Sequence, residues 1–133
     1  MHFYQIDHWV LTVTDLTASL KFYSEILQIP IITFGAGRKA LQIGRQKINL
    51  HIADAPIAPH AKYPTPGSAD ICLLTNTPLS TFITNLETAG VAIELGPVPR
   101  TGAQSQLWSI YLRDPDGNLI EIANPVTREN AAM

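Results

Sequence analysis

The first part of the chain changes from a strand-like to a helix-like hydrophobic pattern. Residues 6–13 (IDHWVLTV) are apolar and rich in branched side chains, which predicts a strand. Thr14-Asp15 then supplies a pair of helix N-cap residues. The segment after this pair has apolar residues at spacings of four, three and four, which is the pattern of one helix face: Leu16, Leu20, Tyr23 and Leu27. We therefore expect a strand followed by an amphipathic helix.

The same order returns in the second half. Residues 69–75 (ADICLLT) predict a strand, and Thr77-Pro78 resembles an N-cap followed by proline at the first helical position. The next segment repeats the apolar stripe and ends at a glycine that suits a helix C-terminus: Leu79, Ile83, Leu86 and Gly90. The strand positions His8 and Asp70 are offset by 70 − 8 = 62 residues. The helix positions Leu16 and Leu79 are offset by 79 − 16 = 63, so the chain contains two similar modules.

Three extended runs follow each predicted helix, at residues 30–35, 38–43 and 46–52, and at 91–98, 106–113 and 118–124. The sequence DPDGN between the last two runs is a turn signal, because proline fixes φ and glycine permits positive φ. The chain therefore predicts an α+β fold of two βαβββ modules. A doubly wound parallel fold is disfavoured, because strands and helices do not alternate one for one.

A proline-rich stretch separates the two modules. Residues 54–67 contain four prolines and resist both helix and interior strand. We expect a single domain over residues 1–126, with module one at about 4–53, this linker, and module two at about 68–125. Residues 127–133 are expected to be a flexible tail.

Composition narrows the possible functions of the chain. Its 133 residues are 46% hydrophobic and 15% charged, enough apolar material for a packed interior, and the net charge is −2. No basic run indicates a nucleic-acid partner, and no apolar stretch is long enough to span a membrane. The single cysteine, Cys72, excludes an intramolecular disulfide and a cysteine-based zinc cluster. Without a signal-peptide pattern at the N-terminus, a cytoplasmic location is expected.

Two segments resemble a known superfamily. DPDGNLIEI (114–122) is similar to the last hairpin of vicinal oxygen chelate proteins, the glyoxalase/bleomycin-resistance/dioxygenase superfamily. DHWVLTVTDLTASLKFYSEIL (7–27) is similar to its first strand and helix, and the resemblance extends from about residue 4 to 124. Within the superfamily, residues 38–51 and 96–104 look most like glyoxalase-domain or virulence-associated proteins. The resemblance implies a curved sheet around a metal and substrate cavity.

The resemblance also implies one metal ligand from the first and last strand of each module. The matching strands carry His8, then Asn49 or His51, then Asp70, then Glu121. We expect His8, His51 and Glu121 as ligands, because imidazole binds divalent transition metals better than an amide does. Asp70 stands where a histidine is more usual in the superfamily. It could bind the metal directly, contact it through a water molecule, or orient His8. This mixed N/O set suits divalent Fe, Mn, Ni or Zn.

Other residues are candidates for contact with a substrate. Arg38 and Arg100 offer planar forks for an anionic group. Trp108 is a candidate aromatic contact, and because Trp108 and Tyr111 have opposite parity on one predicted strand, only one of them can share the inward face. Glu121 and Asp70 are the candidate catalytic carboxylates, as in glyoxalase-type enzymes. We expect a metal-dependent lyase or isomerase that chelates two oxygens of a small substrate and forms a homodimer. The alternatives are a ring-cleaving dioxygenase-like enzyme and a metal-free protein that sequesters a ligand, as bleomycin-resistance proteins do.

Overall fold

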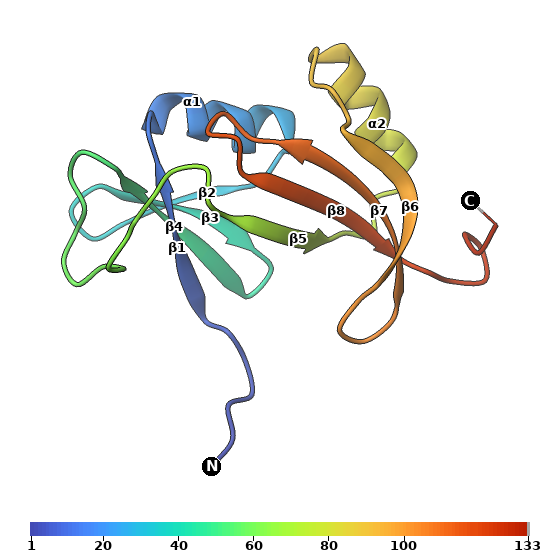
Figure 1. The fold of residues 1–133 in the computed structure, drawn as a ribbon, viewed down its shortest axis with the longest axis horizontal. Coiled ribbons are helices and arrows are strands. Elements are labelled where there is room, and N and C mark those ends of the chain that lie inside the picture. The colour runs from blue at the N-terminus through green and yellow to red at the C-terminus, as the bar shows by residue number, and fades with distance from the viewer. Residues whose placement is uncertain (133) are drawn as a thin grey trace. The chain divides into compact units, whose positions relative to one another are not determined.

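A computed structural model describes residues 1–132 and contains two compact units, Met1–Ser68 (unit 1) and Ala69 onward (unit 2). Figure 1 shows that each unit combines one sheet with one helical segment. The elements of unit 1 are β1 (His8–Val13), α1 (Leu16–Lys21), a π-helical turn η1 (Phe22–Ile26), β2 (Ile31–Phe34), β3 (Arg38–Ile43) and β4 (Gln46–Ile52). Those of unit 2 are β5 (Asp70–Leu74), α2 (Leu79–Thr88), β6 (Leu95–Thr101), β7 (Gln106–Arg113) and β8 (Leu119–Pro125). The predicted α+β fold of two βαβββ modules is confirmed.

The two sheets share one topology. The strand order is β1-β4-β3-β2 in unit 1 and β5-β8-β7-β6 in unit 2. In each sheet the first and last strands of the module pair in parallel, and the other neighbours pair antiparallel. The first and last strand of each module are therefore direct neighbours, which brings their side chains onto a common face.

Each sheet has one apolar face and one face that carries the polar candidates. In unit 2, Ile110, Leu112, Ile120 and Ile122 are buried on the face that receives α2. Alternation places Glu121 on the opposite face. In unit 1, the buried residues Leu11, Val13, Leu41, Ile48 and Tyr23 form the corresponding core. An amphipathic helix covers only one side of a sheet. The uncovered side of each sheet, which carries the polar candidates, is called its open face below.

The start of each helix shows how the chain satisfies its first backbone N–H groups. Asp15 is the N-cap of α1, and its carboxylate accepts from the backbone N of Ala18 at 3.2 Å. The expected cap of the second helix at Thr77 is wrong, because Pro78 is its N-cap and has no capping side chain. Instead, Asn124 of β8 accepts from the backbone N of Leu79 at 3.0 Å. A residue from a distant strand thus caps α2, which local sequence does not reveal.

Two element boundaries differ from the expected ones. The first helix changes to π geometry after Lys21, and Leu27 N donates to Phe22 O, five residues back. The first extended run of the second module begins at Leu95 rather than at residue 91. It contains Gly96, whose φ of +114° and close approach leave a Cβ only 2.4 Å from the Ser109 carbonyl oxygen. Only glycine fits there, so β6 is irregular where an ordinary strand pattern predicts none.

The linker and the C-terminal residues lie outside the helices and strands. No helix or strand occurs between Ile52 and Asp70, which includes the proline-rich stretch. In the expected tail, Thr127 and Asn130 bond to each other, and Asn130 O accepts from the Trp108 indole. Residue 133 lies outside the described part.

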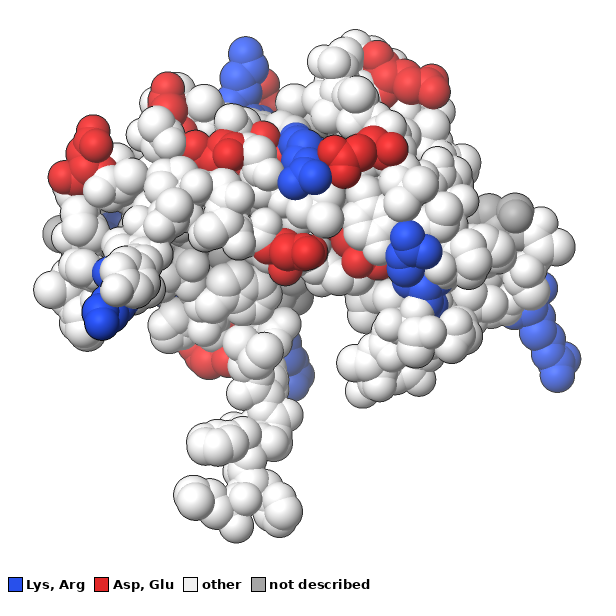
Figure 2. Space-filling view, in the orientation of Figure 1, with Lys and Arg blue, Asp and Glu red and all other residues white. Residues whose placement is uncertain are grey.

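Among residues 1–132 no helix has the length and apolarity to cross a bilayer. Figure 2 shows acidic and basic residues scattered among each other on the visible face.

Candidate functional site

His8 opens β1 and lies on the face of the unit 1 sheet opposite the core. Its Nδ1 is 2.7 Å from Asp7 Oδ2, and the side chain is 46% exposed. With Asp7 accepting at Nδ1, Nε2 is the nitrogen left for a ligand. A carboxylate behind an imidazole is the arrangement that fixes the ring of a metal-binding histidine. Asp7 therefore orients the His8 ring, and the role of His8 as a metal ligand stays a prediction.

His51 lies on the same face of the unit 1 sheet but is buried, with 3% exposure. Its Nε2 is 3.4 Å from Arg38 Nη2, while its Nδ1 has no hydrogen-bond partner. Burial lowers the pKa of His51, and the positive charges of Arg38 and His60 lower it further. The imidazole is therefore neutral at pH 7, the form in which histidine binds a metal. Because arginine only donates, Nε2 is assigned as the acceptor and Nδ1 as the protonated nitrogen.

Asn49 also belongs to this face, and it is 5% exposed with its Oδ1 unpartnered. His8 pairs in register with Lys47, and 51 − 47 = 4 residues separate that position from His51. At roughly 3.3 Å per residue, His51 is about 13 Å from the level of His8, whereas Asn49 is about 7 Å away. The register therefore brings Asn49 closer to His8 than His51, although imidazole remains the better ligand.

Glu121 is the centre of the corresponding face in unit 2. It is half-buried on β8, and its Oε2 accepts from the hydroxyl of Ser109 at 2.6 Å. Ser109 is fully buried on the neighbouring strand β7. A short hydrogen bond from a buried hydroxyl holds the carboxylate in one orientation. The residue expected as a ligand and base is thus held by Ser109, which no sequence motif singles out.

Cys72 and Asp70 stand beside Glu121 on β5. Cys72 pairs in register with Glu121 and is exposed. Although the residue as a whole is exposed, partial burial of its thiol raises the pKa of Cys72 to about 11, with further contributions from the charge and hydrogen bonding of Glu121 and from the charge of Asp70. Asp70 is exposed at the start of the strand, two residues before Cys72. The thiol is therefore protonated at neutral pH, and the two carboxylates are the reactive groups of this strand pair.

Two of the expected substrate residues occupy different faces. Tyr111 pairs with Glu121 in register, so both lie on the open face, and Arg100 Nε donates to the Tyr111 hydroxyl at 2.8 Å. Trp108 has the opposite parity and lies on the α2 face, where its indole donates to Asn130 O at 2.8 Å. Arg100 thus lies beside the Glu121 strand pair. Tyr111, rather than Trp108, provides the aromatic surface on this face.

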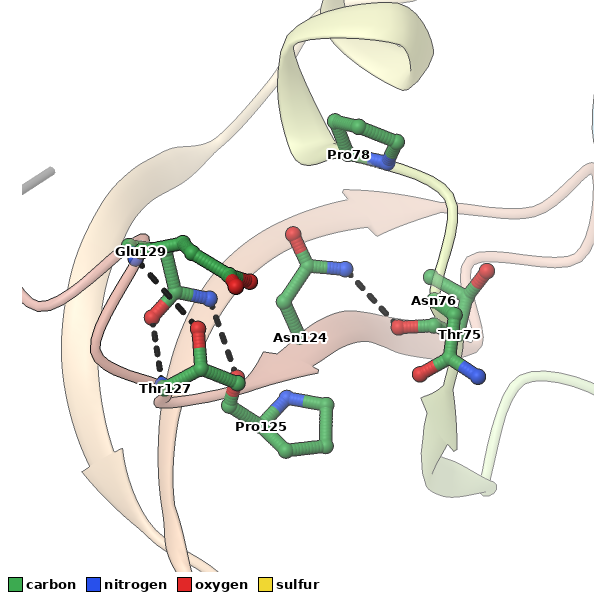
Figure 3. A pocket seen from close by; sticks show the side chains of 8 residues that line it. Thr75, Asn76, Pro78, Asn124, Pro125, Thr127 and Glu129 are labelled. Atoms are coloured by element: carbon green, nitrogen blue, oxygen red, sulfur yellow. Dashed lines mark hydrogen bonds between the residues drawn. The ribbon is translucent and has the colours of Figure 1, made fainter.

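A cavity of about 370 Å³ lies elsewhere in unit 2. Figure 3 shows Asn124, Thr127 and Glu129 among its lining residues, below Pro78 at the start of α2. The Asn124 amide is committed to Leu79 N and to the carbonyls of Thr75 and Thr77. Because Asn124 has the opposite parity to Glu121, this cavity belongs to the helix side of the sheet and not to the candidate site.

The match to a known family extends over nearly the whole chain. Residues 5–122 match the Glyoxalase/Bleomycin resistance protein/Dioxygenase superfamily. The chain belongs to this superfamily. The resemblance of the first strand and helix and of the last hairpin to this superfamily is thereby confirmed. The similarity to virulence-associated proteins is confirmed by the first relative described below. The superfamily description covers an enzyme class, a resistance protein class and an oxygenase class, so membership alone does not choose an activity.

Individual superfamily members support the assignment. "Virulence protein STM3117" of Salmonella typhimurium is 51% identical over 122 residues, which is 92% of this chain and 85% of that protein. Its crystal structure has a TM-score of 0.91 at 50% identity, covering 95% of this chain and 100% of that one. "Glyoxalase domain-containing protein RDO1" of Mycosarcoma maydis is 42% identical, over 90% of this chain and 67% of that protein. Lactoylglutathione lyase from Agrobacterium tumefaciens shares the fold, with a TM-score of 0.68 at 21% identity, over 90% of this chain and 92% of that one.

The superfamily commonly uses a divalent metal, and the donors of this chain fit one chemically. Unit 1 offers His8 with a backing carboxylate and the buried, unpartnered amide oxygen of Asn49. His51 Nδ1 is also unpartnered, but it would have to lose its proton before it could bind a metal. Unit 2 offers the oriented carboxylate of Glu121. Within residues 1–132 no group of three His, Cys, Asp or Glu side chains gathers around one point. The set of His8, His51 and Glu121, drawn from two units, therefore stays a prediction.

Proposed function

We propose that this chain is a metal-dependent superfamily enzyme that acts on a small oxygen-bearing substrate, with lyase or isomerase chemistry. The observation that supports it most is the orientation of Glu121 by the buried hydroxyl of Ser109 at 2.6 Å. A carboxylate that serves only as solvent-facing charge needs no such support. His8, backed by Asp7, is the matching donor of unit 1.

Each residue has a stated part in this proposal. His8 and Glu121 bind the ion, and His51 or Asn49 supplies the third protein ligand. When bound, a divalent ion supplies Lewis acidity to two neighbouring oxygens of the substrate. Glu121 is the first candidate for moving the substrate proton. Ser109 holds its Oε2 in one orientation, and Oε1 is the oxygen left to accept a proton. Asp70, exposed on the same face, is the second candidate.

Calorimetric titration of Mn(II), Ni(II) and Zn(II) into chelator-treated protein tests the ligand set. We expect His8→Ala and Glu121→Gln to weaken binding by more than the roughly 10–100-fold that loss of a supporting group costs. His2→Ala and Glu25→Gln are matched controls on exposed residues and should bind as the wild type does. Comparison of His51→Ala with Asn49→Ala then identifies the third ligand, because only its loss reproduces the effect of His8→Ala. Unchanged affinity in His8→Ala would refute the proposal.

Activity assays on the loaded protein separate the possible reactions. A thiol adduct of a 2-oxoaldehyde tests lyase or isomerase action, and a catechol with dioxygen tests ring cleavage. Glu121→Gln and Asp70→Asn should lower turnover on the adduct if these carboxylates move its proton. Turnover of the catechol alone would favour the dioxygenase-like alternative.

A metal-free ligand-binding protein is the second candidate. It is favoured by the lack of a three-residue metal group among the described residues and by exposed apolar side chains on the open faces, Val10 at 43% and Leu74 at 62%. Such side chains give a ligand apolar contact area without a metal. If no divalent ion binds the wild type, this function replaces the enzyme.

We also propose that two copies pair as a homodimer. Phe3, Tyr4 and Ile6 at the N-terminus are 95%, 96% and 59% exposed in a single chain. Large exposed apolar side chains are typical of interaction surfaces, and two-fold dimers are the commonest assembly. Light scattering should give about 2 × 14.6 = 29.2 kDa, and 14.6 kDa at micromolar concentration would contradict pairing.

A further inference from the structure

Two cationic side chains of unit 1 share one aromatic ring. Lys47 Nζ lies 3.5 Å from the centroid of the Phe34 ring, and the Arg38 guanidinium carbon lies 4.8 Å from the same centroid. Phe34 pairs in register with Arg38 across β2 and β3. Each cation is attracted to the ring face, but the two positive charges repel each other. The ring therefore holds two like charges in one small region of the open face.

These charges have no negative partner within unit 1. The ion pairs among the described residues are His8 with Asp7 and Arg113 with Glu94, and neither includes Arg38 or Lys47. The hydrogen-bond partner of Arg38 is His51 Nε2 at 3.4 Å, and an imidazole ring carries no negative charge. His51 thus orients the guanidinium without compensating its charge.

Lys39, the neighbouring lysine on β3, shows how a surface cation can be satisfied by a nearby polar side chain. Lys39 follows Arg38 directly, points to the other face by alternation, and donates from Nζ to Thr33 Oγ1 at 2.7 Å. Arg38 and Lys47 keep most of their donors free while resting on Phe34. The two distances to the ring centroid place the Lys47 Nζ and the Arg38 guanidinium carbon no more than 3.5 + 4.8 = 8.3 Å apart. A planar guanidinium and an ammonium within that distance can both reach one group with two or three negatively charged oxygens.

We propose that Arg38 and Lys47, supported by Phe34, form a subsite for an oxyanion group, a carboxylate, phosphate or phosphonate, carried by a small-molecule substrate. Lys47 pairs in register with His8, so the subsite lies on the same face as that residue. The link to the substrate of the enzyme rests on the proposed function, whereas anion binding itself does not need a metal. The subsite also gives Arg38 a defined task that a lone surface arginine lacks.

The test uses the full-length, chelator-treated protein at constant ionic strength. Inorganic phosphate, methylphosphonate and acetate are titrated separately, and the NMR signals of the Arg38 Nε–H and the Phe34 ring are followed. We expect saturable shifts with at least one of these anions. Arg38→Gln and Lys47→Gln should each weaken its binding at least about tenfold, the loss expected for a hydrogen bond to a charged group.

Lys39→Gln is the matched control, because it removes the same charge one residue away on the other face. It should leave anion affinity unchanged. The strongest of the three anions identifies whether the subsite prefers a phosphoryl, phosphonyl or carboxylate group. No saturable shift in the wild type, or an equal loss in Lys39→Gln, would overturn the proposal. Metal titration of the same samples is read independently, so failure of the metal site and failure of the anion subsite are distinguishable.

Discussion

Replacement of Ser109 by alanine removes the group that holds Glu121. Ser109 is fully buried, and its hydroxyl donates to Glu121 Oε2 at 2.6 Å. A hydrogen bond to a charged group contributes about 1.5–3 kcal/mol, and the half-buried carboxylate would recover part of this from water. We therefore expect Ser109→Ala to lower the free energy of unfolding by about 1–2 kcal/mol.

Ser19 provides a matched control within the same chain. It is also fully buried, but its hydroxyl has no hydrogen-bond partner. Ser19→Ala creates the same small loss of volume, removes an unsatisfied polar group, and places a better helix former in α1. We therefore expect Ser19→Ala to be neutral or slightly stabilising. The difference between the two variants isolates the hydrogen bond to Glu121.

Urea unfolding followed by circular dichroism measures both variants. The expected result is a lower midpoint for Ser109→Ala with an unchanged denaturant slope, and an equal or higher midpoint for Ser19→Ala. Equal destabilisation by both changes would mean that only packing volume matters at Ser109. The orientation of Glu121 by Ser109 would then carry no energy, and the main support for the proposed function would be lost.

Two further predictions follow from the titrating groups. Cys72 is exposed, but its pKa is raised to about 11. At pH 8, iodoacetamide should therefore alkylate Cys72 about tenfold more slowly than it alkylates a free cysteine peptide. The thiolate fraction of Cys72 is much lower, but the greater nucleophilicity of its thiolate offsets part of that difference. Glu121→Gln should speed the reaction, and a peptide-like rate in the wild type would contradict the assigned surroundings of the thiol. NMR titration of His51, assigned with His51→Asn, should give a pKa below 6.5 that rises in Arg38→Gln but stays below 6.5, because burial is the larger cause. Because the pKa of His51 is lower in the folded form, His51 does not reduce the stability of the fold above about pH 6.5. Below that pH the unfolded chain takes up a proton at His51 more readily than the folded chain does, so the stability falls. An unchanged His51 pKa in Arg38→Gln would refute the contact between Arg38 and His51.

Much of the fold follows from local patterns in the sequence. Alternating branched residues define the strands, and the repeat offset between His8 and Asp70 marks the two modules. The π-helical end of the first helix is not predictable this way, because the apolar stripe to Leu27 suits either helical geometry. The capping of Leu79 by Asn124 also depends on pairing between distant strands.

The candidate site was predictable where alternation alone decides the face. Tyr111 and Ser109 have the same parity on β7, so their position beside Glu121 could be expected once the strand pairing was known. The partners of Arg38 could not, because they depend on the register of three strands that brings Phe34, Lys47 and His51 to one face. Sequence spacing shows which residues can share a face, but not which of them meet.

The central claim is that His8 and Glu121 bind one divalent ion. A crystal structure of the Mn(II)-loaded protein, with anomalous diffraction data, tests it most directly. The account predicts an anomalous peak bonded to His8 Nε2 and to a carboxylate oxygen of Glu121, supplied by one chain or by two paired chains. Well-ordered His8 and Glu121 side chains without a shared peak would contradict it.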